Sequence, residues 1–178
     1  MAGYTGAAFD QEAGEGKLGI REMWNKTFDV NVSGAYVVTD VFMPLLLQSA
    51  DPRLLFLTSG LSSLSRTSEK FYPLSEPPPA GWPKKVPRSS IAYRSVKAGL
   101  NMLMVNLNFY LTEDRVKVWA VSPGFLATGL LGVGAEALRQ AGAGDPSVGG
   151  NFIKDIVEGK RDADVGKVVY NDGTNQPW

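Results

Sequence analysis

The chain has 178 residues, of which 44% are apolar and 20% charged, a composition typical of one globular domain with a real core. Its 18 basic and 18 acidic residues cancel, which excludes the charge pattern of a protein that binds nucleic acid or an anionic membrane. With no Cys and no His, we expect no disulfide and no metal site, and any acid–base chemistry falls to Tyr, Lys, Asp or Glu.

The first residues contain neither the basic nor the apolar segment of a signal peptide. The longest dense apolar stretch, residues 35–47, is interrupted by Thr39, Asp40 and Pro44 and is too short to span a bilayer. We therefore expect a cytoplasmic protein that does not enter a membrane.

The first half of the chain predicts a loop, a helix and a strand. Residues 1–19 are rich in Gly and Ala and have no periodicity, which indicates a loop. Apolar residues then recur at steps of three and four, which predicts a helix over residues 20–48. Gly34 favours close approach of another backbone to this helix, and Pro44 bends or ends it. The apolar run at residues 53–58 predicts a strand that is buried on both faces.

The second half adds a long loop and a further series of elements. Residues 60–92 are interrupted by six prolines and predict a long proline-rich loop. The elements expected after it are helices at 91–111, 135–140 and 151–158, with strands at 116–121 and 166–170. Alternation of helices and strands gives a parallel sheet, so we expect one α/β domain over residues 1–178. The order starts on a helix, as though earlier strands were missing.

Tyr93 and Lys97 are four residues apart and therefore share one face of their helix. An ammonium group near a phenol stabilises the phenolate and lowers the tyrosine pKa from about 10. A tyrosine tuned in this way exchanges a proton with a carbonyl or an alcohol near neutral pH. The spacing alone is weak evidence, because six tyrosines and ten lysines produce such a pair by chance fairly often.

Three other positions give this pair a context. Ser59 follows the strand at 53–58, at the edge where parallel sheets bind ligands, although an isolated serine there is usually part of a turn. Asn31 places an amide in an apolar helix face, where it is usually satisfied by backbone. Pro123 and Gly124 follow the strand at 116–121, with Thr128 close behind, and this segment is equally consistent with an ordinary turn.

Together, in this order and on these elements, the motifs resemble those of the short-chain dehydrogenase/reductase family, and the resemblance extends from Ala2-Gly3 to the end of the chain. It implies a Rossmann-like parallel sheet with flanking helices, truncated to its C-terminal strands. It implies the following catalytic and cofactor-binding residues: Asn31, Ser59, Tyr93, Lys97, Pro123, Gly124 and Thr128. The resemblance implies that Tyr93 is the acid/base, that Ser59 polarises the carbonyl and that Asn31 supports a water. It also implies that Lys97 binds the nicotinamide ribose and lowers the Tyr93 pKa, and that Thr128 binds the nicotinamide carboxamide beside the Pro-Gly turn.

Two features depart from that family. The Ser59–Tyr93 separation is about twenty residues longer than usual. The extra segment is either a substrate lid with Phe71, Tyr72 and Trp82 or a solvated proline-rich loop. The glycine-rich phosphate loop of the family is absent. The Gly14–Gly19 segment matches GxGxxG in letters, but no apolar strand precedes it and Glu15 repels a pyrophosphate, so we interpret it as the loop before the first helix.

The expected activity is an oxidoreductase that interconverts a secondary alcohol and a ketone with NADP or NAD, NADP being slightly preferred. Because the phosphate loop is absent, we expect the chain by itself to bind dinucleotide poorly. The alternative is an inactive fragment that acts as an interaction module. In either case the resemblance implies a possible homo-oligomer through the helices at 20–48 and 91–111.

Overall fold

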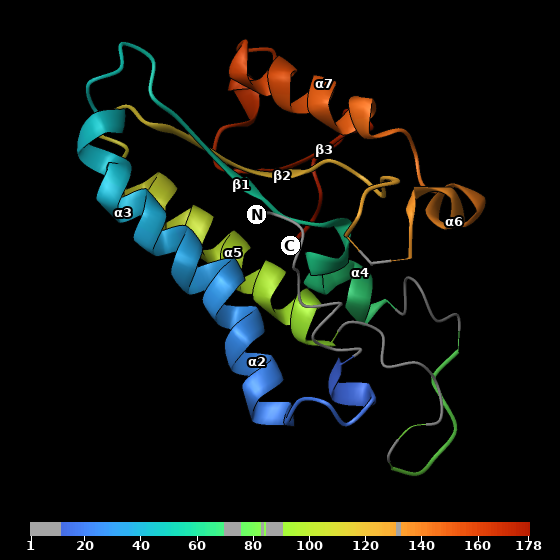
Figure 1. Cartoon of the computed structure of the whole chain (residues 1–178). Helices are drawn as coiled ribbons and strands as arrows, with labels where there is room; N and C mark the ends of the chain where they lie inside the picture. The colour runs from blue at the N-terminus through green and yellow to red at the C-terminus, as the bar shows by residue number, and fades with distance from the viewer. Residues whose placement is uncertain (1–11, 70–75, 83, 85–90, 131–132) are drawn as a thin grey trace.

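The computed structural model describes residues 12–69, 76–82, 84, 91–130 and 133–178. Figure 1 shows its helices and strands in their order along the chain. The elements are α2 (Ile20–Phe28), a π-helical turn (Asp29–Ser33), α3 (Gly34–Leu46), β1 (Arg53–Leu57), a 3-10 turn (Gly60–Ser62), α4 (Leu64–Ser68), α5 (Ile91–Tyr110), β2 (Lys117–Ser122), α6 (Ala135–Gln140), α7 (Pro146–Val157), a 3-10 turn (Asp162–Asp164) and β3 (Val168–Tyr170). No helix in this part of the chain is long and apolar enough to cross a membrane.

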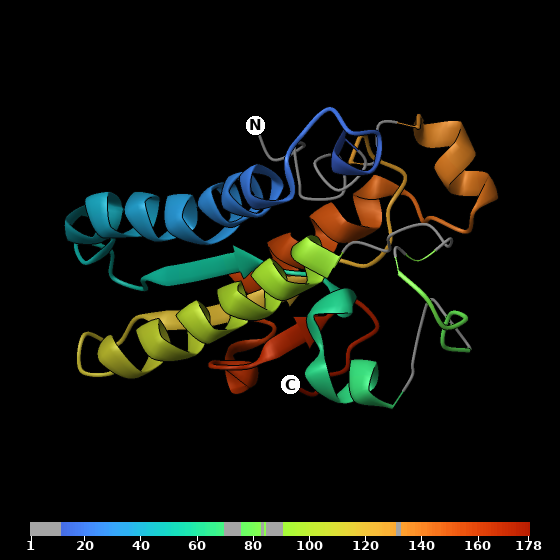
Figure 2. The same cartoon turned by 90° about the horizontal axis from the view of Figure 1, so that it is seen from below.

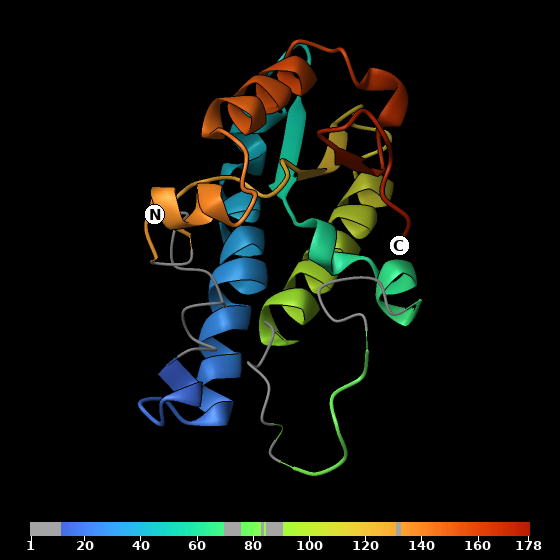
Figure 3. The same ribbon diagram turned by 90° about the vertical axis from the view of Figure 1, so that its right-hand side faces the viewer.

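The three strands form one parallel sheet in the order β1-β2-β3. Leu57 of β1 is paired in register with Val121 of β2, and Ala120 of β2 with Val168 of β3. Helices flank the sheet, which Figure 2 shows from below and Figure 3 from the side. The predicted α/β class with a parallel sheet is confirmed.

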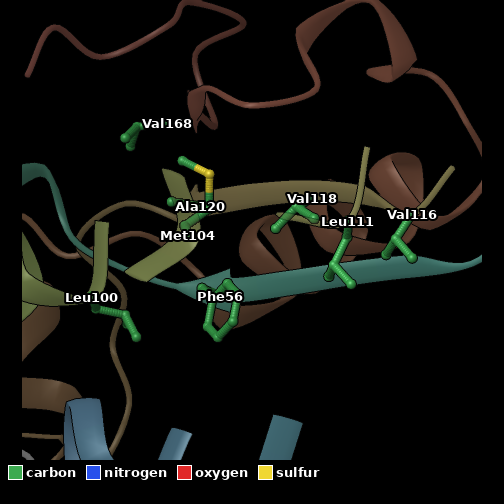
Figure 4. Close-up of a cluster of buried hydrophobic side chains, with 8 residues drawn as sticks. All are labelled: Phe56, Leu100, Met104, Leu111, Val116, Val118, Ala120 and Val168. Atoms are coloured by element: carbon green, nitrogen blue, oxygen red, sulfur yellow. The ribbon is translucent and has the colours of Figure 1, made fainter. Parts of the chain in front are cut away.

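The core has one apolar cluster on each face of the sheet. Figure 4 shows the first cluster, in which Leu100 and Met104 of α5 pack with Phe56, Val118 and Ala120 of the strands. Side chains of α3 cover its rim. The second cluster consists of strand residues packed against α7: Trp119, Val121, Val169 and Ile156. Successive residues of β2 belong to opposite clusters, so this strand is buried on both faces, as in other parallel sheets.

β1 is one of the two edge strands of the described sheet, although its sequence is that of a strand buried on both faces. The Thr58 N–H donates to Val121 and the Pro52 carbonyl accepts from Lys117. Because backbone groups alternate along a strand, the polar groups of Leu55 and Leu57 point away from β2. Leu57 is 44% exposed. In the part of the chain that the structure describes, one side of this strand is therefore open.

The predicted helix over residues 20–48 is interrupted by the π-helical turn and ends at Leu46, shortly after Pro44. The role expected for Gly34 is wrong. A Cβ there would meet the Asp29 carbonyl oxygen of its own helix at 3.0 Å. The close approach between helices occurs instead at Gly99 of α5, where a Cβ would lie 3.6 Å from Val32.

The expected loop over residues 60–92 is wrong at its start, where the 3-10 turn and α4 form. The Ser63 hydroxyl caps α4 by accepting from the Arg66 N–H at 3.2 Å. Phe71 and Tyr72 of the expected lid lie outside the described residues, and Trp82 is exposed. The Gly14–Gly19 segment connects a helical turn at residues 12–14 to α2, in keeping with a loop before the first helix.

Four charged side chains join the amino ends of β1 and β2 to the loop before β3. The two terminal guanidinium nitrogens of Arg53, Nη1 and Nη2, donate to the Asp162 carboxylate at 2.6 and 3.0 Å. Lys117 binds Asp162 at 2.7 Å and Asp51 at 2.8 Å. This cluster lies at the edge of the sheet opposite to Ser59, so it stabilises the sheet and leaves the carboxyl edge free for a site.

Candidate active site

Ser59, Tyr93 and Lys97 lie together at the carboxyl end of β1. Ser59 is the second residue after the strand, and Tyr93 and Lys97 occupy the first two turns of α5. The Ser59 Oγ accepts from the Leu61 N–H at 3.2 Å, and the Ser59 side chain is near enough to Tyr93 to lower its pKa. The Lys97 Nζ lies 5.8 Å from the centroid of the Tyr93 ring. The structure thus brings together three of the four catalytic residues expected from the sequence.

The Lys97 ammonium group is buried and is held by the edge strand. Only 8% of the residue is exposed, and its Nζ donates to the Leu57 carbonyl oxygen at 2.8 Å. Burial lowers the pKa of Lys97 to about 8, because the charged form loses its hydration. The side chain is therefore still mostly protonated at neutral pH, but its buried charge destabilises the folded chain.

The pKa of Tyr93 is raised, which differs from the expected direction. Burial is the larger cause, since it disfavours the phenolate, and the Ser59 side chain offsets part of the rise. The expected lowering assumed an ammonium close to the phenol oxygen. In the structure Lys97 instead directs its Nζ to Leu57. Tyr93 is consequently a neutral phenol, the form that donates a proton to a carbonyl.

Asn31 is buried within the π-helical turn. Its Nδ2 donates to the Thr27 carbonyl oxygen at 2.9 Å, four residues earlier in the helix. This is the backbone-satisfied amide that the sequence left open as the alternative. A π-helical turn is frequent at functional sites, and this one packs against α5, the helix of Tyr93 and Lys97.

The segment after β2 is held against the C-terminal part of the chain. Gly124 has a φ of +94°, and a Cβ there would lie 2.6 Å from the Asn171 Nδ2, so this position requires glycine. Pro123 packs against Gly149 of α7. The Thr128 Oγ1 accepts from the Leu130 N–H at 3.4 Å. These contacts fix the segment at the same edge of the sheet, while none of them joins it to Tyr93 or Lys97.

Three residues that sequence reasoning missed lie directly behind Ser59. Ser62, Asn101 and Gln176 are buried, and both amides donate to the Ser62 hydroxyl. The sequence could have indicated Asn101, because it is a polar residue one turn after Lys97 on the buried face of α5. It could not have indicated Gln176, because no local pattern in the last residues of the chain predicts burial.

The chain matches no family model. It is 50% identical over 165 residues to the short-chain dehydrogenase/reductase tropE of Talaromyces stipitatus, covering 91% of this chain and 61% of that protein. It is 45% identical over 181 residues to the short-chain dehydrogenase/reductase eupG of a Phoma species, covering 98% of this chain and 65% of that protein. The chain belongs to the short-chain dehydrogenase/reductase family. The family resemblance of the sequence is thus confirmed, and the chain spans less than two thirds of the length of these relatives.

Solved structures agree on the fold. The NADPH-bound carbonyl reductase from chicken fatty liver superposes with a TM-score of 0.66 at 15% identity, over 87% of this chain and 57% of that one. The carbonyl reductase Sniffer of D. melanogaster gives a TM-score of 0.61 at 19% identity, over 86% of this chain and 56% of that one. The sheet and its flanking helices therefore match a Rossmann-like dehydrogenase fold that is truncated relative to these neighbours.

Proposed function

We propose that this dehydrogenase/reductase chain carries the proton-transfer centre of an NAD(P)-dependent oxidoreductase that interconverts a secondary alcohol and a ketone. The observation that carries the proposal is the buried phenol of Tyr93, which has the buried Lys97 Nζ 5.8 Å from its ring centroid and the Ser59 side chain beside it. Burial removes competing water, so each polar group of the trio acts more strongly on a bound carbonyl than it does in solution.

Each side chain has a distinct role in this proposal. Tyr93 donates its phenol proton to the carbonyl oxygen in reduction and accepts it in oxidation. The Ser59 hydroxyl donates a hydrogen bond to the same oxygen and stabilises the charge that develops there. The Lys97 ammonium binds the ribose hydroxyls of the cofactor, and Asn31 supports a water behind it. A bound nicotinamide dinucleotide supplies or accepts the hydride.

The described residues fit only the nicotinamide end of such a cofactor. Lys97 offers a buried cation, and Gly124 leaves the backbone after β2 without a side chain. Pro123 and Thr128 follow the same strand and complete the proposed contacts to the nicotinamide. In the described ranges no glycine-rich turn follows a strand on the open side of β1, where a pyrophosphate needs backbone N–H groups. NADP is slightly preferred to NAD, and the chain by itself is expected to bind either weakly.

Calorimetric titration of the folded chain with NADPH and then NADH tests the expected weak binding. A dissociation constant in the low micromolar range would contradict it and would justify assay as an enzyme.

In that assay, reduction of small aliphatic and aromatic ketones should fall about 10²–10⁴-fold in Tyr93→Phe. Tyr110→Phe, on the exposed far end of the same helix, is the matched control and should retain the rate. Equal rates for the two variants would refute the role of Tyr93.

A second candidate function is an interaction module, and the surface of α3 favours it. Thr39 is the only fully buried residue of this helix, and its exposed side chains are mostly large and apolar: Val37, Val38, Val41, Phe42 and Leu45. Met102 and Phe109 extend apolar exposure onto α5. A helix that is apolar all round is normally covered on every side. We propose that a second copy of the chain covers it.

Sedimentation velocity tests this oligomer. The unaltered chain should sediment as a dimer or larger species, and Val41→Glu should shift it towards the monomer, because the substitution buries a charge in the interface. Val148→Glu places the same charge at an exposed apolar position of α7 and should leave the association unchanged. A monomeric unaltered chain would exclude the module.

A further inference from the structure

The turn that carries Ser59 is built around one buried hydroxyl. The Ser62 Oγ lies 2.7 Å from the Ser59 carbonyl oxygen, 2.9 Å from the Asn101 Nδ2 and 3.1 Å from the Gln176 Nε2. Only 4% of Ser62 is exposed. Three separate parts of the chain therefore converge on this oxygen: the 3-10 turn, α5 and the C-terminal tail.

The hydrogen-bond capacity of Ser62 fixes the orientation of both amides. Its single proton is used at the Ser59 carbonyl oxygen, so it accepts one N–H each from Asn101 and Gln176. The Thr58 hydroxyl lies 3.2 Å away and has the Lys97 carbonyl oxygen at 3.5 Å as another acceptor. Within the described ranges the amide oxygens of Asn101 and Gln176 have no partner, so the amides are held by their donor sides alone.

The C-terminal tail, residues 171–178, is pinned on both sides of Gln176. The Gln176 N–H donates to the Val168 carbonyl of β3 at 2.8 Å, which adds the tail to the edge of the sheet. The Trp178 carbonyl then accepts from the Ser65 N–H of α4 at 2.6 Å. Figure 3 shows the tail running from β3 to α4. This path places the Gln176 side chain next to Ser62, where Gln176 is 5% exposed.

We infer that Gln176 is a positioning residue for Ser59, and that it acts through the Ser62 hydroxyl. The inference rests on the proposed function of Ser59 and Tyr93. Gln176 and Asn101 both donate to the Ser62 hydroxyl, which in turn donates to the Ser59 carbonyl oxygen. A longer contact of 3.5 Å joins the Gln176 Nε2 to that same oxygen. The backbone of Ser59 is thereby fixed in an extended conformation, with its side chain beside Tyr93.

The titration of Tyr93 reports this positioning without any need for turnover. The Ser59 hydroxyl lowers the Tyr93 pKa, so losing it should move the Tyr93 titration to higher pH. The folded chain, labelled with ¹³C at the tyrosine ring carbon that bears the hydroxyl, is titrated by NMR, and Tyr93→Phe assigns the signal. Ser59→Ala gives the full displacement expected when the Ser59 hydroxyl is absent.

Gln176→Met should move the Tyr93 titration part of the way towards that of Ser59→Ala. Methionine has a similar volume and lacks the N–H donor, so packing is kept while the hydrogen bond is removed. Gln140→Met makes the same change at an exposed position of α6 and should leave the titration unmoved. An unmoved titration in Gln176→Met, with Ser59→Ala displaced, overturns the positioning role and leaves the Ser59–Tyr93 pairing standing. An unmoved titration in Ser59→Ala overturns that pairing and the positioning role with it.

Ser62→Ala is the second variant, and it covers the case in which Gln176→Met does not fold. It should displace the Tyr93 titration in the same direction. Adding Gln176→Met to Ser62→Ala should produce little further displacement, because Gln176 acts through the hydroxyl that is already missing. Additive displacements in the double variant would show that the two residues act separately and would refute the inference.

Discussion

Replacing Lys97 by Met should make the folded chain more stable at neutral pH. Burial lowers the pKa of Lys97 from its ordinary value of 10.5 to about 8, and the residue is almost fully buried. Each pH unit between the two values corresponds to about 1.4 kcal/mol, so the buried ammonium costs about 3 kcal/mol. The Leu57 carbonyl oxygen loses its donor in the variant, which costs about 1 kcal/mol. The free energy of unfolding should therefore rise by about 2 kcal/mol.

The advantage of Lys97→Met should shrink as the pH rises. The folded-state pKa of Lys97 lies below its unfolded value, so between pH 8 and 10.5 the unfolded chain holds a proton that the folded chain has released. Stability of the unaltered chain therefore increases with pH across that window, relative to the variant. Below pH 8 the cost of the charge is fully present.

Urea unfolding followed by tryptophan fluorescence at pH 7 and pH 10 measures this difference. Lys154→Met removes an exposed lysine of α7 and should stay within about 0.5 kcal/mol of the unaltered chain at both pH values. If Lys97→Met unfolds at the same or lower urea concentration than the unaltered chain at pH 7, the reasoning from burial is refuted. A difference that stays constant up to pH 10 would contradict the titration of Lys97 as its source.

Two further substitutions test parts of the chain that hold the site in place. Hydrogen bonds from Arg53, the larger cause, and from Lys117 lower the pKa of Asp162 to about 2. The stability that the Asp162 carboxylate adds to the folded chain is therefore present above pH 3.8 and is lost as the pH falls towards 2. Its side chain is partly exposed and screened by solvent, so Asp162→Asn should lower the urea midpoint by an amount equivalent to about 1 kcal/mol at pH 7, with no difference near pH 2. Gly124→Ala should lower stability by about 1–3 kcal/mol in thermal unfolding, because of its positive φ and the contact with Asn171. Gly129→Ala, where a Cβ meets nothing within 4 Å, should change little, and equal effects at the two glycines would contradict this account.

The positions of the candidate catalytic residues could be predicted because each follows from a local pattern. Tyr93 and Lys97 share a helix face through their spacing, and Ser59 sits at the carboxyl end of a strand that its apolar run reveals. The parallel sheet follows from the alternation of elements. Both patterns depend on which residues are buried along a helix or a strand, and that information is periodic in the sequence.

Other features of the site depend on contacts between distant segments. The expected effect of Lys97 on the Tyr93 pKa assumed a direct approach of the two groups, but desolvation is decided by what packs around them. The interruption of the first helix by a π-helical turn left no mark in its apolar periodicity. The sequence did not predict α4, because the capping residue Ser63 is its one sequence indication and lies within a stretch whose other residues are typical of a loop.

The sequence by itself determined the resemblance to the family, the alternation of the long helices with the strands and the group of residues at the carboxyl edge of the sheet, because these are carried by local spacing and periodic burial. The tertiary structure alone decided how those residues are held. Gln176 reaches Ser62 across 114 residues of chain, and Lys97 binds a carbonyl on an open strand edge. Such contacts form only when separate segments pack together, and they fix the charge and direction of each candidate catalytic group through burial and hydrogen bonds that no local pattern specifies.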